Sequence, residues 1–154
     1  MSLTDAGVAE SLAPGARGLD QLRAMLGRGG KGGIGQTMGF TMVEAEDGMV
    51  AFEGEPGEQH YNPIGTVHGG YAATLLDSAC GCAVHSKLAS GQGYTTLELK
   101  VAYHKAMTAD TGPVRAEGKV VTLGRRAAFA EARLTDEAGT LLASATSTLL
   151  VFER

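Results

Sequence analysis

The sequence predicts an α+β fold, in which a curved antiparallel sheet of five to six strands wraps around one long central helix. Two observations support this prediction. Small and apolar residues continue without proline from Val67 to about Leu88, which makes this stretch the longest helical candidate in the chain. On both sides of it, short apolar or alternating segments are separated by glycine-containing turns, as expected for antiparallel strands.

The composition indicates a globular protein that acts without nucleic acid or membrane. The chain has 154 residues, of which 44% are hydrophobic and 19% are charged, and one domain of this size can bury a substantial core. The net charge of −4 argues against nucleic acid, because phosphate binding needs a basic face. No apolar run reaches the roughly 18 residues of a membrane-spanning helix, and the N-terminus lacks a signal-peptide pattern. We therefore expect a cytoplasmic protein.

We predict that the N-terminal region consists of a mobile segment followed by a short helix. Residues 1–18 show no sustained periodicity, so we expect them to be disordered and residues 19–154 to form a single domain. Apolar residues at a spacing of three and four then predict a short amphipathic helix that ends at Gly27 and covers the fold: Leu19, Leu22, Met25 and Leu26.

A glycine-rich stretch follows this short helix. Residues 27–33 formally match G-x-G-x-x-G, the pattern of dinucleotide-binding loops. That fingerprint requires a strand before it and a helix after it, whereas here a predicted helix precedes and a predicted strand follows. We interpret the stretch as a flexible connector.

The remaining elements are predicted as strands. Residues 34–45 and 49–53 form a hairpin around the Asp47-Gly48 pair, and residues 89–93 are a break after the long helix. Beyond the break, residues 97–103 alternate apolar and polar side chains, with Leu97 and Leu99 on one face. Three further strands, at 114–123, 127–135 and 140–152, complete a predicted meander.

The start of the long helix combines features that suit attack on a carbonyl group. Gly69 and Gly70 in its first turn would let another group approach backbone N–H donors that have no partner inside the helix. Two turns later Asp77 is a single carboxylate among small residues. An anion-binding helix end and an acid can together stabilise and attack a carbonyl. The alternative is a close-packing Gly-Gly pair and a hydrogen-bonded core acid.

The spacing of these residues resembles a known signature. Asn62, Gly65-Thr66, His68-Gly69-Gly70 and Asp77 resemble the motif of the hotdog-fold acyl-CoA thioesterases, in their phenylacetate-degradation (PaaI-like) branch. Residues 95–103, Gly124-Arg125-Arg126 and residues 136–139 resemble the later strands and hairpins of that family, so the resemblance extends from 34 to 152. It implies the hotdog fold, which agrees with the fold class predicted from the pattern.

The resemblance also implies a reaction, which is the hydrolysis of an aryl- or medium-chain acyl-CoA to the free acid and coenzyme A, with no cofactor beyond the substrate's own coenzyme A. Asp77 would be the general base or the nucleophile, and the Gly69 and Gly70 amides would stabilise the oxyanion. Asn62 would orient the attacking water. His68 would either hold the loop or polarise the carbonyl.

In the family the acid of one subunit faces the helix start of another, so the resemblance implies a homo-oligomer, either a dimer or a dimer of dimers (a homotetramer) with active sites at the subunit interface. It also selects Thr96 as an assisting hydroxyl. Strict alternation, however, places Thr95 on the face of Leu97 and Leu99, so Thr96 can face the helix only if the strand contains a bulge.

Coenzyme A carries phosphates, and the candidate cations are Arg125, Arg126 and Lys105. Two adjacent arginines in a turn are also compatible with simple solvation. The family pattern Tyr-Leu-Arg-Pro is replaced here by Tyr103-His104-Lys105-Ala106, which leaves the position of Lys105 less constrained.

Other site chemistries fit less well. Cys80, Cys82 and His85 resemble a metal cluster in composition, but helical geometry would scatter them, so we expect no metal site. An acyl-CoA hydratase or dehydratase and a non-catalytic acyl-CoA sensor are alternatives on the same fold. The spacing of Asn62, Gly65 and Asp77 favours the thioesterase.

Overall fold

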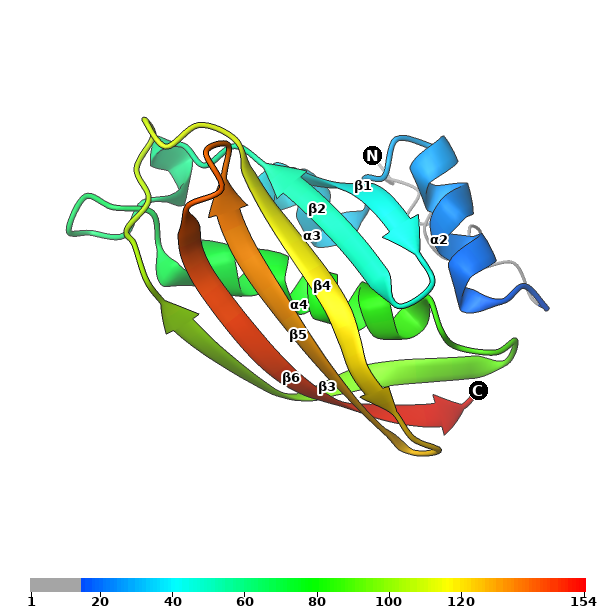
Figure 1. Ribbon diagram of the computed structural model, residues 1–154. Helices are drawn as coiled ribbons and strands as arrows, with labels where there is room; N and C mark the ends of the chain where they lie inside the picture. Colours follow the sequence, from blue (N-terminus) through cyan, green and yellow to red (C-terminus); the bar gives the residue numbers. More distant parts are fainter. Residues whose placement is uncertain (1–14) are drawn as a thin grey trace.

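A six-stranded antiparallel sheet curves around the long helix α4 in the computed structural model, which describes residues 15–154 (Figure 1). The strand order in the sheet is β1-β2-β4-β5-β6-β3. The elements in chain order are α2 (Gly18–Gly27), α3 (Gly33–Met38), β1 (Phe40–Glu46), β2 (Met49–Gly54), a 3-10 turn η1 (Glu58–His60), α4 (Gly69–His85), β3 (Gln92–Tyr103), β4 (Val114–Leu123), β5 (Ala127–Asp136) and β6 (Leu141–Glu153). The predicted fold class is confirmed. The expectation of disorder for residues 1–18 falls mostly on residues 1–14, which lie outside the described residues, while Gly18 is the first residue of α2.

Helix α4 packs its apolar side against the concave face of the sheet. Leu75, Leu76 and Ala79 are fully buried there, and β5 turns Ala130 and Leu134 inward in strict alternation. Small residues let the two layers come close together. Gly118 of β4 is one of them, since a Cβ at this position would overlap the backbone of Ala79. The helix is shorter than the predicted span of 67 to 88 and ends at His85.

The turns confirm the predicted hairpins. Glu46 pairs with Met49 around Asp47 and Gly48, and Gly48 has a φ of 86°, which glycine adopts without strain. Strands β4, β5 and β6 form a meander whose bounds lie within one residue of the predicted ones. The predicted position of β3 in the meander is wrong. This strand pairs with β6 and lies at the far edge of the sheet, not beside β4.

The predicted strand at 34–45 is wrong in its first half. Residues 33–38 form the short helix α3, which ends at Gly39 with a φ of 77°. The N–H of Gly39 donates to the carbonyl of Gly35 at 2.8 Å and closes the last turn, so the strand begins only at Phe40. The glycine-rich connector is thus followed by a helix and not by a strand. Helix α2, which precedes the connector, ends at Gly27 as predicted.

One edge of the sheet is covered by helices, and the other is open. Helices α2 and α3 pack against β1 and cover that edge (Figure 1). The outer edge of β3 has no strand partner within residues 15–154, and its Leu97 and Tyr103 are 60% and 57% exposed. Helices long and apolar enough to span a membrane do not occur in the described part of the chain.

Candidate active site

The predicted acid and the predicted hydroxyl meet in the structure. The Oγ1 of Thr96 donates a hydrogen bond to Oδ1 of Asp77 at 2.9 Å. The register of β3 against β6 shifts between Thr96 and Glu98, which is the bulge that Thr96 needed in order to face the helix. Thr95 is exposed at the rim of the cavity beside these residues and is not hydrogen bonded to Asp77. The predicted alternation is wrong at Leu97, because the bulge turns this side chain to solvent and not to the face of Leu99.

Asp77 lies on the side of α4 that the sheet does not cover. It is half-buried, not fully buried as a core acid would be, and it belongs to a stripe of partly exposed small residues along the helix: Ala73, Thr74, Ser78 and Cys82. Its carboxylate is therefore accessible to a substrate. We call Asp77 and Thr96 together the acid half-site.

A cavity of about 920 Å³ opens beside the acid half-site. One wall comes from α4 and β3 and includes Asp77, Cys82, His85, Tyr94 and Thr96. The facing wall comes from the N-terminal elements and is mainly apolar, with contributions from Leu22, Met25, Ile34, Phe40 and Phe52. Such a cavity, apolar on one side and with a few polar groups on the other, suits a small organic group.

The far end of this cavity holds a polar group of residues. Nε2 of His85 lies 2.7 Å from Oε1 of Gln21 on α2, and burial lowers the pKa of His85, so that the ring is neutral at pH 7. Burial also raises the pKa of the Cys82 thiol to about 12, and a hydrogen bond joins Cys82 to Tyr94. Cys82 is thus a protonated thiol at neutral pH. Because Nε2 of His85 is engaged by Gln21, Asp77 is the candidate nucleophile or base in this cavity.

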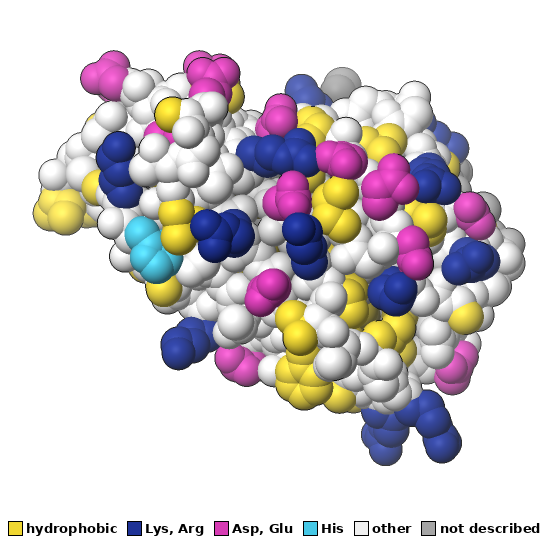
Figure 2. Space-filling view, in the orientation of Figure 1, with side chains coloured by type: hydrophobic (Ala, Val, Ile, Leu, Met, Phe, Trp, Pro, Cys, Tyr) yellow, Lys and Arg dark blue, Asp and Glu magenta, His cyan; other side chains and the backbone are white. Residues whose placement is uncertain are grey.

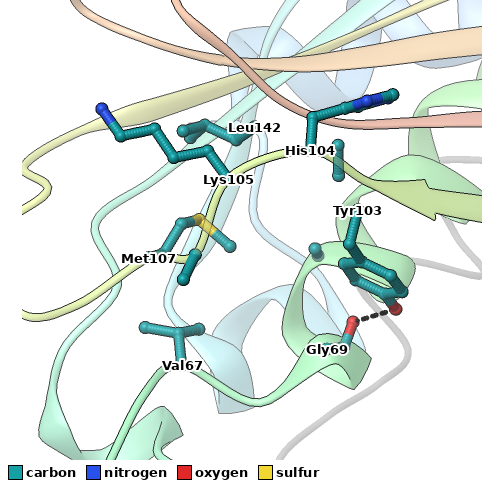
Figure 3. A pocket seen from close by; sticks show the side chains of 10 residues that line it. Val67, Gly69, Tyr103, His104, Lys105, Met107 and Leu142 are labelled. Atoms are coloured by element: carbon teal, nitrogen blue, oxygen red, sulfur yellow. Dashed lines mark hydrogen bonds between the residues drawn. The ribbon is translucent and has the colours of Figure 1, made fainter.

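The start of α4 is held by two side chains. His68 is the N-cap residue, and its Nδ1 accepts a hydrogen bond from the N–H of Gly70 at 2.8 Å. The hydroxyl of Tyr103 at the end of β3 donates to the carbonyl oxygen of Gly69 at 2.8 Å (Figure 3). The peptide between Gly69 and Gly70 is therefore fixed at its C=O and at its N–H.

Both glycines are required by this arrangement. A Cβ on Gly69 would lie 2.9 Å from the Tyr103 hydroxyl, and one on Gly70 would lie 2.8 Å from Nδ1 of His68. The prediction that both glycine amides stabilise the oxyanion is corrected in part, because the Gly70 N–H already donates its hydrogen bond to His68. The N–H of Gly69 has no hydrogen-bond partner among the residues that the structure describes. We call His68, Gly69 and Tyr103 the amide half-site.

A second cavity, of about 330 Å³, lies beside Gly69 (Figure 3). Val67, Tyr103, His104, Lys105 and Met107 are among the side chains that line it. Lys105, predicted as a phosphate contact, is exposed and extends away from Gly69 in this view. Tyr103 was not predicted as a site residue from the sequence. A tyrosine at the end of a strand could have indicated it, but only if the end of that strand was known to lie beside the start of the helix.

Asn62 organises the loop that precedes α4. Its Oδ1 accepts from the N–H groups of Ile64 and Thr66 at 3.1 and 3.2 Å, and its Nδ2 donates to Oγ1 of Thr66 at 2.9 Å. Both ends of the side-chain amide are thus engaged within the loop. Its proposed role in orienting water stays a prediction.

Arg125 and Arg126 lie at the exposed tip of the β4–β5 hairpin, next to a separate hollow lined by Leu123 and Phe129. Lys and Arg side chains project from this end of the molecule (Figure 2). The carbonyl of Arg126 accepts from the N–H of Val151, which pairs with Tyr94, so the tip lies about two strand spacings, roughly 10 Å, from β3. The arginines therefore lie nearer to the acid half-site with Asp77, and Lys105 lies nearer to the amide half-site with Gly69.

The acid and the amide half-sites are separate within one chain. Asp77 is eight residues after Gly69 on the same helix, a separation of about 12 Å at roughly 1.5 Å per residue. Reacting groups must approach within about 3–3.5 Å of one another, so one carbonyl group cannot contact both half-sites of the same chain. The described residues contain no cluster of His, Cys, Asp and Glu that would hold a metal ion.

An acid with a hydroxyl partner beside an apolar cavity, on a helix wrapped by a sheet, defines a class of hydrolase, and comparison with known families identifies it. The sequence profile of the Thioesterase superfamily matches residues 64–143, a span that contains every residue of both half-sites. The chain therefore belongs to the thioesterase superfamily and is a hydrolase that acts on thioester bonds.

Individual relatives agree with this assignment. The 1,4-dihydroxy-2-naphthoyl-CoA hydrolase of Listeria monocytogenes is 27% identical over 119 residues, which are 77% of this chain and 95% of that protein. A hypothetical thioesterase of Streptococcus pneumoniae, solved with coenzyme A, is 28% identical, with a TM-score of 0.68 over 75% of this chain and 90% of that one. A Streptococcus mutans protein solved with acetyl CoA is 29% identical, with the same TM-score and coverage.

Proposed function

We propose that this protein hydrolyses an acyl-CoA thioester to a free acid and coenzyme A, at a site that combines the acid half-site of one chain with the amide half-site of another. The observation that carries the proposal is the hydrogen bond from Thr96 to Asp77 beside an accessible apolar cavity. The coenzyme A and acetyl CoA bound to the two streptococcal proteins support coenzyme A as the thiol part of the substrate.

The chemistry follows from the groups present. As water attacks the carbonyl carbon, its proton passes to Asp77 and negative charge develops on the carbonyl oxygen. The Gly69 N–H, at the positive end of α4, stabilises that charge. The carbon–sulfur bond then breaks, and the coenzyme A thiolate leaves and takes up a proton. In the alternative course, Asp77 attacks directly and water hydrolyses the resulting anhydride.

Thr96 and Tyr103 position the reacting groups in this proposal. The hydrogen bond from Thr96 holds one oxygen of Asp77 and leaves the other oxygen for the water or the carbonyl carbon. Tyr103 and His68 fix the peptide between Gly69 and Gly70. The preceding peptide, which carries the Gly69 N–H, is held by the N–H of Tyr71, which donates to the carbonyl of His68 at 2.9 Å, so the Gly69 N–H keeps its direction during the reaction.

The proposal requires at least a dimer, because the two half-sites of one chain lie too far apart. The unpaired outer edge of β3 and the exposed apolar Leu97 on that strand support pairing with a second copy. The partly exposed small residues of α4 would allow the other chain to approach the helix closely. A dimer of dimers is the further assembly that we propose.

The acyl and nucleotide ends of the substrate follow from the same arrangement. We propose an aryl or medium-chain acyl group, as in the phenylacetate-degradation branch, because the cavity beside Asp77 is large and partly apolar. Arg125, Arg126 and Lys105 would contact the coenzyme A phosphates.

The test is a thiol-release assay of the wild-type protein and Asp77→Asn against aryl, short, medium and long acyl-CoA esters. We expect turnover that disappears in the variant while its circular dichroism is unchanged. Saturable acyl-CoA binding without turnover of any ester would contradict hydrolysis and favour a sensor. Hydration of an enoyl-CoA, in place of thiol release, would favour the hydratase alternative.

A further inference from the structure

The cavity beside Asp77 has two walls of different origin. Apart from Arg154 at the C-terminus, the wall with Asp77 and Thr96 lies within residues 64–143, which match the family profile. The opposite wall is formed by residues 22–52, all of them N-terminal to that match. Its first part consists of α2, α3 and the glycine-rich connector between them, whose composition predicted flexibility.

Helix α2 is fixed firmly to the end of α4. The N–H of Gly18 donates to the carbonyl of Leu88 at 3.0 Å, and Gln21 hydrogen bonds to the buried His85. A Cβ on Gly18 would overlap the carbonyl oxygen of His85, so the two backbones are in direct contact. Helix α2 is thus a fixed part of the cavity.

The connector after α2 is also held in place. The N–H of Gly30 donates to the carbonyl of Met25 at 2.9 Å, and the N–H of Met42 on β1 donates to the carbonyl of Gly30 at 3.0 Å. A side chain on Gly33 would meet nothing within 4 Å. Gly30, Gly32 and Gly33 therefore line the cavity with backbone, and at Gly33 there is space that a side chain would fill.

Met25 and Ile34 are the two large apolar side chains of this segment that line the cavity without being buried. Met25 is half-buried and packs partly against the hydrophobic core, and Ile34 is 56% exposed, whereas Leu22 and Phe40 are buried. Both side chains therefore offer apolar surface to the occupant of the cavity.

The occupant of this cavity follows from its chemistry and dimensions. A thioester whose carbonyl carbon is at Asp77 extends in two directions, and its phosphate-bearing part needs cations and solvent rather than an apolar wall. The cavity runs beside α4 from Asp77 to His85, a distance of about 12 Å at roughly 1.5 Å per residue. That length suits an arylacetyl or a medium-length acyl group, which would end at a group of polar residues: Cys82, His85, Tyr94 and Arg154, the single cation among the described residues of this cavity.

We propose that residues 18–38 form the acyl-selecting wall of this enzyme, and that Met25 and Ile34 set the size of the acyl group that it accepts. This inference rests on the proposed function. It assigns the N-terminal segment, which the family profile does not include, to substrate specificity.

The experiment compares kcat/KM for acetyl-, butyryl-, octanoyl- and phenylacetyl-CoA in the wild type, Met25→Trp and Ile34→Trp. The matched control is Ala24→Trp, which adds the same bulk to an exposed position on α2. We expect both wall variants to lose about tenfold or more in kcat/KM for octanoyl- and phenylacetyl-CoA relative to acetyl-CoA, in the range of pocket-size effects. The control should keep the wild-type profile.

Two further outcomes separate this inference from the function on which it rests. A wild-type protein that hydrolyses none of the esters would remove the proposed function itself. A wild-type protein that hydrolyses them, with a profile that is the same in Met25→Trp, Ile34→Trp and Ala24→Trp, would overturn the wall assignment alone. If a tryptophan variant fails to fold, Met25→Ala decides the matter, since enlarging the cavity must shift the preference towards larger acyl groups.

Discussion

The two half-sites lie on one helix, but they are held by contacts of different range. In the amide half-site, the bond between His68 and Gly70 joins residues two positions apart, and Tyr103 adds one contact from the end of β3. In the acid half-site, Thr96 reaches Asp77 from a strand 19 positions later, and only because β3 contains a bulge. The geometry of the acid half-site therefore depends on strand register, whereas that of the amide half-site is mainly local.

The largest effect is expected from Asp77→Asn. The amide can still accept the hydrogen bond of Thr96 but can neither take up a proton nor attack a carbonyl. We expect kcat to fall by about 100- to 10,000-fold, the range of general base catalysis, with an unchanged melting temperature. Asp110→Asn, at an exposed position, is the control and should retain wild-type kinetics. Near-normal turnover by Asp77→Asn would remove the acid from the mechanism.

Thr96→Val tests the bulge together with the acid half-site. The substitution removes one hydrogen bond to a charged group, a contribution of roughly 1.5 kcal/mol or more, so we expect kcat to fall by about tenfold or more. Thr96→Ser should restore activity. Thr146→Val, at an exposed position on the neighbouring strand β6, is the matched control. If Thr146→Val lowered kcat as much as Thr96→Val, the Thr96 hydroxyl would have no part in holding Asp77.

A smaller effect is expected from Tyr103→Phe in the amide half-site. It removes the donor to the Gly69 carbonyl, a neutral hydrogen bond of about 0.5–1.5 kcal/mol, and we expect kcat to fall about two- to tenfold with KM nearly constant. Tyr61→Phe, which removes a hydroxyl bonded to the Ala109 N–H, serves as the control. A change in KM alone, with kcat intact, would mean that Tyr103 contacts the substrate instead of positioning the peptide.

The smallest effect is expected from Arg126→Ala, which lies outside both half-sites. Because the side chain is exposed, we expect KM for acyl-CoA to rise only about threefold at low salt and less at high salt. The KM for a short thioester without the nucleotide should not change. Arg133→Ala, another exposed arginine, provides the comparison. Equal effects on both kinds of thioester would exclude a phosphate contact.

The difference between the half-sites also explains what the sequence could predict. The start of α4 was predictable because Gly69, Gly70 and His68 lie together in a local motif, and strand β4 at 114–123 was predictable from its pattern and flanking turns. Thr96 could be placed only conditionally, because alternation assumes a regular strand. The contact of Tyr103 with Gly69 joins distant segments, so no local pattern indicates it.

The glycine-rich connector shows the same limit. Its composition indicated mobility, and Ile34 after it was assigned to a strand. The structure instead places Gly30 in a hydrogen-bonded position and Ile34 in a short helix beside the cavity. A glycine can serve flexibility, close packing or an open wall, and only the surrounding backbone distinguishes among these uses.

The most direct test of the central claim, that one site takes its two halves from different chains, is complementation between two inactive variants. Asp77→Asn destroys only the acid half-site, and Gly69→Ala, whose Cβ would lie 2.9 Å from the Tyr103 hydroxyl, disturbs only the amide half-site. Each variant alone should be nearly inactive. Co-expressed chains that mix randomly as dimers should regain about a quarter of the wild-type activity, because half of the dimers carry one intact site of two. Mixed dimers that form but show no recovery would contradict a site shared between chains.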